Sequence, residues 1–119
     1  MLLRRSALTI LFAAWTLMAA DLSGTWDAAV ESSLGSGNPS FVFKQDGEKL
    51  TGDYSGALGA AKLTGSVKGD AVEFRFKADA GGESIDVVYS GTVSEGGKKI
   101  SGTVAFGSLG EGTFTATRR

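Results

Sequence analysis

Apolar and polar residues alternate with a period of two through almost all of the chain after residue 20. Such alternation is typical of β-strands that bury one face. It is clearest over 72–76, where Val72, Phe74 and Phe76 alternate with Glu73 and Arg75. No segment has the period of a helix. The apolar positions predict eight strands, near 22–30, 41–43, 50–54, 63–67, 72–76, 85–93, 100–106 and 112–116.

A five-residue phrase recurs within these strands: an apolar residue, a small polar one, glycine, a polar one, and an aromatic or β-branched residue. Its copies span 22–26, 50–54, 63–67, 89–93 and 100–104. The phrase places glycine on the apolar face in mid-strand, where each glycine costs about 0.5–1 kcal/mol relative to alanine. These inward glycines are Gly24, Gly52, Gly65, Gly91, Gly102 and Gly112.

The glycines decide between two architectures that eight antiparallel strands can form, a β-sandwich and an up-and-down barrel. Glycine on the inner face allows a strand to coil sharply and lets a neighbouring aromatic ring lie over the gap. Closure into a barrel also removes exposed sheet edges. We therefore predict an all-β fold, an eight-stranded antiparallel up-and-down β-barrel, with a β-sandwich as the alternative.

The first 20 residues have the layout of a secretory signal peptide. Arg4 and Arg5 precede an apolar run over 7–18, and small residues end the segment at Ala20. The run is too short to span a bilayer, which needs about 20 apolar residues. We expect residues 1–20 to be a signal peptide, residues 21–119 to form a single β-barrel domain, and the protein to be secreted or periplasmic.

Charge limits the classes of partner that the protein can have, and cysteine content limits the sources of its stability. Two of the 12 basic side chains and no acidic one lie in the predicted signal, so the rest of the chain has 10 basic and 13 acidic side chains. This mildly acidic surface argues against nucleic acid and, after signal removal, against a membrane as a partner. The chain contains no cysteine, so its stability depends on the core and the hydrogen-bond ladder.

The two ends of the predicted barrel differ in their connections. One end has short, charged turns near residues 46–48, 69–70 and 94–97. The other has longer loops with apolar residues, including Leu34, the segment 57–61, and Leu109. We expect the first end to be a closed floor and the second to be a mouth, where ligands enter barrels. The loop leucines alternatively fold back as a lid that completes the core.

Several segments resemble the avidin and streptavidin barrel across nearly the whole chain after residue 20. They are the start of the first strand at 23–26, the segments 49–54 and 56–60, and the last strand at 112–115. A Gly-x-Trp start at Gly24 and a terminal arginine, Arg118, is also similar to the wider calycin group of lipocalins and fatty-acid-binding proteins. The resemblance implies that Arg118 lies across Trp26 at the closed end as a cation–π contact; a solvated terminus is the alternative.

The biotin-binding positions of avidins are mostly absent. Tyr54 matches the family, but its first-strand asparagine corresponds to Ala28, its serine to Gly56 and its last-strand aspartate to Gly112. Each buried polar group of a ligand left without a partner costs about 1–3 kcal/mol. We therefore do not expect biotin binding. The chain is also similar to small exported bacterial domains of unknown function, which implies a location and no activity.

Enzymatic chemistry has few candidate residues. The chain has no histidine and no cysteine, so the usual general base, thiol nucleophile and transition-metal ligands are missing. Asp27 and Asp53 lie on polar faces and are expected to be surface charges. Asp79 with Glu83 lacks the spacing of a dedicated calcium loop. We expect no enzyme activity, no catalytic residue, no metal and no cofactor.

The leading hypothesis is therefore a non-enzymatic barrel that binds a small, mainly apolar ligand at the mouth. An eight-stranded barrel is just wide enough for its own side chains or for one small molecule. The alternative is a protein-interaction or inhibitor-type module with a solid core, and the oligomeric state stays open. The predicted ligand-binding residues are Leu34, Tyr54, Leu58, Phe76, Tyr89, Phe106 and Leu109, and the predicted structural residues are Trp26, Arg118, Gly24, Gly52, Gly65, Gly91 and Gly102.

Overall fold

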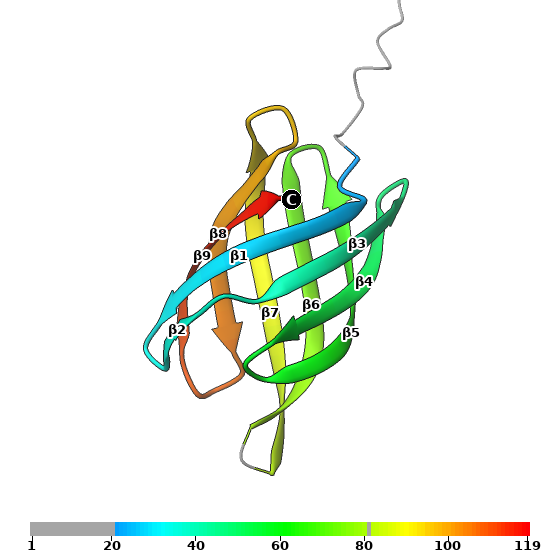
Figure 1. Cartoon of the computed structure of the whole chain (residues 1–119). Helices are drawn as coiled ribbons and strands as arrows, with labels where there is room; N and C mark the ends of the chain where they lie inside the picture. Colours follow the sequence, from blue (N-terminus) through cyan, green and yellow to red (C-terminus); the bar gives the residue numbers. More distant parts are fainter. Residues whose placement is uncertain (1–20, 81) are drawn as a thin grey trace, which may run out of the picture.

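The computed structural model describes residues 21–80 and 82–119, so the predicted signal peptide lies outside the described residues. These residues form one antiparallel sheet that curves into a barrel (Figure 1). Its strands are β1 (Gly24–Ser32), β2 (Gly35–Gly37), β3 (Ser40–Asp46), β4 (Lys49–Gly56), β5 (Gly59–Lys68), β6 (Ala71–Ala80), β7 (Glu83–Ser94), β8 (Lys99–Phe106) and β9 (Glu111–Arg118).

The first and last strands close the barrel. β1 pairs with β9 from Trp26 opposite Arg118 to Ser32 opposite Gly112. Every other strand of the barrel pairs with its neighbour in chain order, except that β3 replaces β2 beside β1. The predicted eight-stranded up-and-down barrel is confirmed, and the β-sandwich is excluded.

A ninth strand, β2, lies within a segment that the sequence pattern predicts as a loop. It pairs with the end of β1, from Val30 opposite Gly37 to Ser32 opposite Gly35. The turn between them is held by the Ser32 hydroxyl, which accepts a hydrogen bond from the Leu34 amide at 3.1 Å and donates to the Gly35 carbonyl at 2.9 Å. β2 has no apolar alternation, since its residues are Gly35, Ser36 and Gly37; it is held by the backbone ladder and by the Ser36 hydroxyl, which donates to the Glu31 carboxylate at 2.8 Å.

Two connections at the mouth are shorter than predicted. Gly56 pairs with Gly59, so β4 and β5 are joined by a two-residue turn of Ala57 and Leu58. Ala80 likewise pairs with Glu83, and the β6–β7 hairpin projects beyond the other connections at this end (Figure 1). The expectation of longer loops is wrong here because backbone pairing extends the strands past the end of the apolar alternation.

The inward glycines allow neighbouring strands to approach closely. A methyl group added at Gly65 would overlap the carbonyl oxygen of Glu73 on β6, and one added at Gly102 would overlap that of Ser90 on β7. Gly52, Gly91 and Gly112 have the same relation to adjacent strands. Gly24 differs from them: it is exposed, has a φ of +132° and lies beside the Arg118 guanidinium.

The closed end is built around Trp26, which is fully buried. Its indole N–H donates to the Leu22 carbonyl at 2.9 Å, and the Arg118 guanidinium lies 4.9 Å from the centre of its ring. Arg118 also donates to the backbone carbonyls of Ser23 at 2.6 Å and Gly97 at 3.2 Å. The predicted cation–π contact at the floor is therefore present.

Aromatic side chains fill the middle of the barrel. The Phe41 ring makes edge contacts with Phe74 and Tyr89 at centroid distances of 5.0 and 5.2 Å, and it stacks on Phe43 at 5.6 Å. Phe74 and Tyr89 are stacked at 4.9 Å. This part of the interior is solid, so any hollow must lie nearer the mouth.

Candidate functional site

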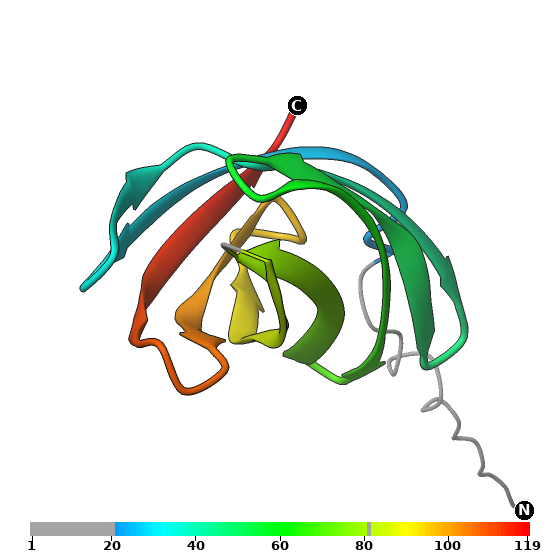
Figure 2. The same cartoon turned by 90° about the horizontal axis from the view of Figure 1, so that it is seen from below.

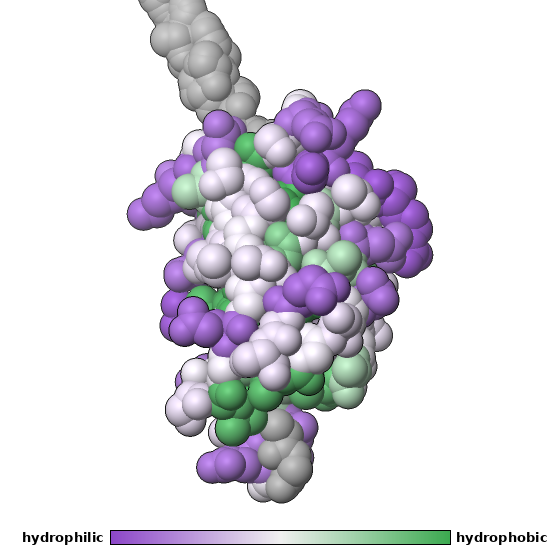
Figure 3. Space-filling view, turned by 90° about the vertical axis from the view of Figure 1, so that its left-hand side faces the viewer, coloured by the Kyte–Doolittle hydropathy of each residue, from purple (hydrophilic) through white to green (hydrophobic). Residues whose placement is uncertain are grey.

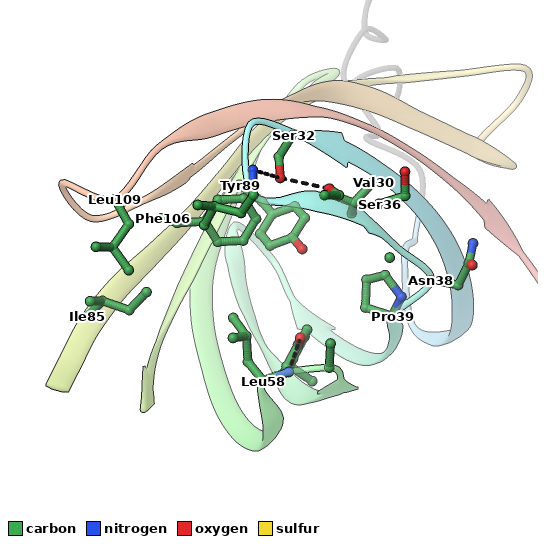
Figure 4. Close-up of a pocket in the computed structure, with 15 residues that line it drawn as sticks. Val30, Ser32, Ser36, Asn38, Pro39, Leu58, Ile85, Tyr89, Phe106 and Leu109 are labelled. Carbon is green, nitrogen blue, oxygen red and sulfur yellow. Dashed lines mark hydrogen bonds between the residues drawn. The ribbon is translucent and has the colours of Figure 1, made fainter. Parts of the chain in front are cut away.

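An apolar cavity of about 150 Å³ lies at the mouth, above the aromatic core. Figure 2 views the barrel from this end, and Figure 4 shows the side chains around the cavity. Its inner wall includes Val30, Tyr54 and Tyr89, and its rim includes Leu34 and Leu109. The cavity is thus bounded by strands that come from both ends of the chain.

Six of the seven predicted ligand-binding residues line this cavity; they are Leu34, Tyr54, Leu58, Tyr89, Phe106 and Leu109. Phe76 does not. Its ring stacks on that of Tyr54 with centroids 4.2 Å apart, so it supports the cavity wall from behind. Phe76 also borders a gap in the wall, because β5 and β6 pair only between Thr64 opposite Arg75 and Lys68 opposite Ala71.

One side of the rim is formed by two connections in contact. The Ser33 amide in the β1–β2 turn donates to the Glu111 carbonyl at 3.3 Å. The loop from β8 to β9 is fixed by the Leu109 amide, which donates to the Phe106 carbonyl at 2.9 Å. These backbone bonds place Leu34 and Leu109 at the same edge of the cavity, although 75 positions separate them in the sequence.

The opposite side is fixed by a contact between Tyr54 and the β4–β5 turn. The Tyr54 hydroxyl accepts a hydrogen bond from the Leu58 amide at 3.3 Å. Gly56 leaves room for this hydroxyl, because a methyl group at Gly56 would lie 2.6 Å from the Tyr54 oxygen. The turn thereby presents Leu58 to the cavity (Figure 4).

The two tyrosines give the cavity its polar groups on the inner wall. Burial raises the pKa of the Tyr89 hydroxyl far above its usual range, and the neighbouring Tyr54 raises it further. Burial also raises the pKa of Tyr54, although its hydrogen bond with the Leu58 amide opposes this shift. Both hydroxyls are therefore uncharged at neutral pH and can donate or accept hydrogen bonds.

The sequence pattern did not single out three further residues of the cavity wall, Val30, Pro39 and Ile85. Val30 and Ile85 were predicted to point inward, but alternation does not show which inward residues border a void. Pro39 is the only proline of the chain and is buried. Its carbonyl accepts from the Ala28 amide at 2.9 Å, which holds the segment between β2 and β3 against β1.

The carboxylates that the sequence offered as candidates lie on the exposed surface, away from the cavity lining. None of the side chains that line the cavity is charged. Within residues 21–80 and 82–119, no three His, Cys, Asp or Glu side chains gather in a way that could hold a metal ion. Asp27, considered above as a candidate carboxylate, forms an exposed ion pair with Arg119 at 2.7 Å. Asp53 likewise pairs with Lys62 at 2.9 Å.

Apolar side chains also reach the surface around the mouth. Figure 3 shows hydrophobic residues gathered near this end of the molecule. Leu34 is 56% exposed and Leu109 is 44% exposed, whereas large apolar side chains are more often buried. Leu34 and Leu109 therefore give the rim exposed apolar side chains, which are common at ligand or partner sites.

The fold and the cavity together define the class: a small closed antiparallel β-barrel, compatible with a calycin-like fold, with an apolar cavity at its mouth. Comparison with known protein families finds no family that matches the chain, and comparison with curated protein sequences finds no match either. The part of the chain that the structure describes contains no helix with the length and hydropathy of a membrane-spanning segment.

Proposed function

We propose that the protein is an exported, non-enzymatic barrel that binds a small, mainly apolar ligand at its mouth. The observation that supports this most directly is the 150 Å³ cavity, whose lining is mainly tyrosine, phenylalanine, valine, isoleucine, leucine and proline side chains, with Ser32, Ser36 and Asn38 on its β2 side. An apolar cavity of similar size in another protein stays dry and binds benzene or xenon. The side chains that line an empty cavity lack van der Waals partners on one side, and a ligand would supply those contacts.

The resemblance to avidins extends in this proposal to the barrel and its closed end, and does not include the biotin site. The barrel and the Trp26–Arg118 floor contact agree with a calycin-like architecture. Ala28, Gly56 and Gly112 supply none of the side-chain hydrogen bonds expected at the corresponding biotin positions. We propose an avidin-like scaffold whose ligand is less polar than biotin.

A ligand screen tests the proposal. The purified protein is titrated with fluorescent apolar probes and analysed by native mass spectrometry for a retained molecule. We expect probe fluorescence to rise on binding, and the Leu58→Glu variant to abolish the rise because it places a carboxylate at the cavity. Val42→Glu on the exposed outer face of β3 is the matched control and should bind normally. Absence of both probe binding and a retained ligand would contradict the proposal.

A second candidate is a protein-interaction or inhibitor-type module. The solid aromatic interior and the exposed Leu34 and Leu109 favour it. This candidate predicts that a polar substitution at Leu34 or Leu109 prevents capture of a partner from the envelope fraction while leaving apolar probe binding unchanged. The ligand proposal predicts instead that these substitutions reduce the binding of apolar probes.

A further inference from the structure

We infer that the mouth cavity selects an uncharged molecule that has an apolar body and one hydrogen-bonding oxygen, and that the Tyr89 hydroxyl binds this oxygen. The inference rests on the proposed function and adds to it the chemical class of the ligand. Its evidence is the position of one buried hydroxyl, the absence of charge on the cavity wall and the charges around the rim.

The Tyr89 hydroxyl points into the cavity (Figure 4). Tyr89 is 2% exposed, and its ring is held between Phe74, stacked at 4.9 Å, and the edge contact with Phe114, also at 4.9 Å. Because the ring is fixed, the hydroxyl cannot turn outward to solvent. In the part of the chain that the structure describes, this hydroxyl has no hydrogen-bond partner, whereas that of Tyr54 binds the Leu58 amide.

A buried hydroxyl without a partner is unfavourable, because it has lost its hydrogen bonds to water. A ligand oxygen in the cavity would restore one such bond. A carbonyl or ether oxygen can accept the tyrosine proton, and an alcohol can accept or donate. An aliphatic or purely aromatic hydrocarbon would fill the space and leave the Tyr89 hydroxyl without a partner.

Charge excludes carboxylates and other anions from the same position. No lysine or arginine lines the cavity, so a buried anion would have no counter-ion. Exposed carboxylates, among them Glu31, Glu83 and Glu111 at the mouth ends of β1, β7 and β9, would repel it. The low polarity that raises the pKa of Tyr89 disfavours ionised groups of the ligand for the same reason.

The volume limits the ligand to about the size of a benzene ring with a short substituent that reaches the open mouth. Acetophenone, ethylbenzene and benzoate are therefore suitable probes. The first two have nearly the same shape and differ by a carbonyl oxygen. Benzoate has a similar ring and a negative charge. Comparison of the three separates the contribution of the oxygen from those of shape and charge.

The test is a titration of the full protein with each probe, followed by amide chemical shifts in NMR spectra. We expect acetophenone to bind about fivefold more tightly than ethylbenzene, the usual contribution of one neutral hydrogen bond. Benzoate should not bind. Tyr89→Phe should reduce the acetophenone affinity to that of ethylbenzene or below it, because the carbonyl then has no partner, and should leave ethylbenzene binding unchanged. Val42→Ala, on the outer face of β3, is the control and should preserve the fivefold ratio.

The outcomes distinguish this inference from the proposed function. If acetophenone and ethylbenzene bind equally, if their ratio survives Tyr89→Phe, or if benzoate binds as well as acetophenone, the assignment of ligand class is overturned while the apolar site stands. If none of the probes shifts an amide of the cavity wall, the proposed function itself is contradicted. Dispersed amide spectra of Tyr89→Phe establish that the variant is folded.

Discussion

At the scale of single residues, the two tyrosines and the two terminal arginines have different surroundings that their sequence positions do not reveal. Tyr54 and Tyr89 both line the cavity, but only the Tyr54 hydroxyl is bonded to a backbone amide among the described residues. Arg118 is partly buried over Trp26, whereas its neighbour Arg119 is exposed and pairs with Asp27. Each difference leads to a measurable effect.

The first prediction concerns the ionisation of tyrosine. The ordinary tyrosine pKa is 10.0, and the folded pKa of Tyr89 is raised above it by burial. Stability from this group is fully present below the unfolded pKa and is lost as pH rises above it, because only the unfolded chain ionises readily. We expect Tyr89 to contribute no tyrosinate absorbance at a pH of about 11 until the protein unfolds.

The Tyr54→Phe variant assigns this signal, because the chain has only two tyrosines. In this variant Tyr89 alone should remain unionised until alkaline unfolding. Reversible ionisation of Tyr89 near its ordinary pKa, without loss of folded structure, would show that the hydroxyl is in contact with water.

The second prediction compares the arginines. Arg118→Ala removes a cation–π contact and charge-assisted hydrogen bonds to backbone carbonyls, and it should lower the free energy of unfolding by about 2 kcal/mol. Arg119→Ala should change it little, since exposed ion pairs contribute little to stability. Urea unfolding followed by Trp26 fluorescence measures both. Equal effects of the two substitutions would refute the role assigned to the floor contact.

At the scale of elements, backbone approach at the glycines explains how eight strands close into a small barrel. Gly65 on β5 lies opposite Phe74 on β6, and Gly102 on β8 lies opposite Gly91 on β7. At each of these positions a side chain would meet the backbone of the neighbouring strand. Glycine is required there for space, and the recurring phrase in the sequence is the consequence.

The third prediction tests this requirement. Gly65→Ala should lower the free energy of unfolding by about 1–3 kcal/mol, the range for overpacking a tight site. Gly37→Ala is the matched control, because a methyl group there has no atom within 4 Å and Gly37 has no unusual φ. The control should be neutral or slightly stabilising. Thermal or urea unfolding of the two variants gives the comparison, and a neutral Gly65→Ala would contradict the close approach of β5 and β6.

Much of the barrel could be predicted from sequence because period-two alternation depends only on local geometry. Val72, Phe74 and Phe76 point inward as their spacing indicates. The β2 strand could not be predicted, since Gly35 and Gly37 have no side chain that could show an alternating pattern. The prediction that Phe76 lines the ligand site is wrong, because alternation shows only that this residue points inward. Its stacking on Tyr54, which removes it from the cavity surface, depends on the relative twist of two strands.

At the scale of the whole molecule, the floor and the mouth have opposite properties. The floor is closed by Leu22, Trp26 and Arg118, and the middle is filled by aromatic rings. The free volume lies at the mouth, between connections from distant parts of the chain. The sequence indicated which end would be apolar, but the cavity itself arises only when the β1–β2 turn and the β8–β9 loop meet at one edge.

The proposed function depends on an apolar cavity at the mouth that a small molecule can occupy. A crystal of the protein pressurised with xenon tests it most directly, because xenon occupies apolar cavities of this size without needing hydrogen bonds. We expect one xenon atom to bind between Tyr89, Leu58 and Phe106. A cavity filled by ordered water, or closed by the leucines of the rim with no xenon bound, would contradict it.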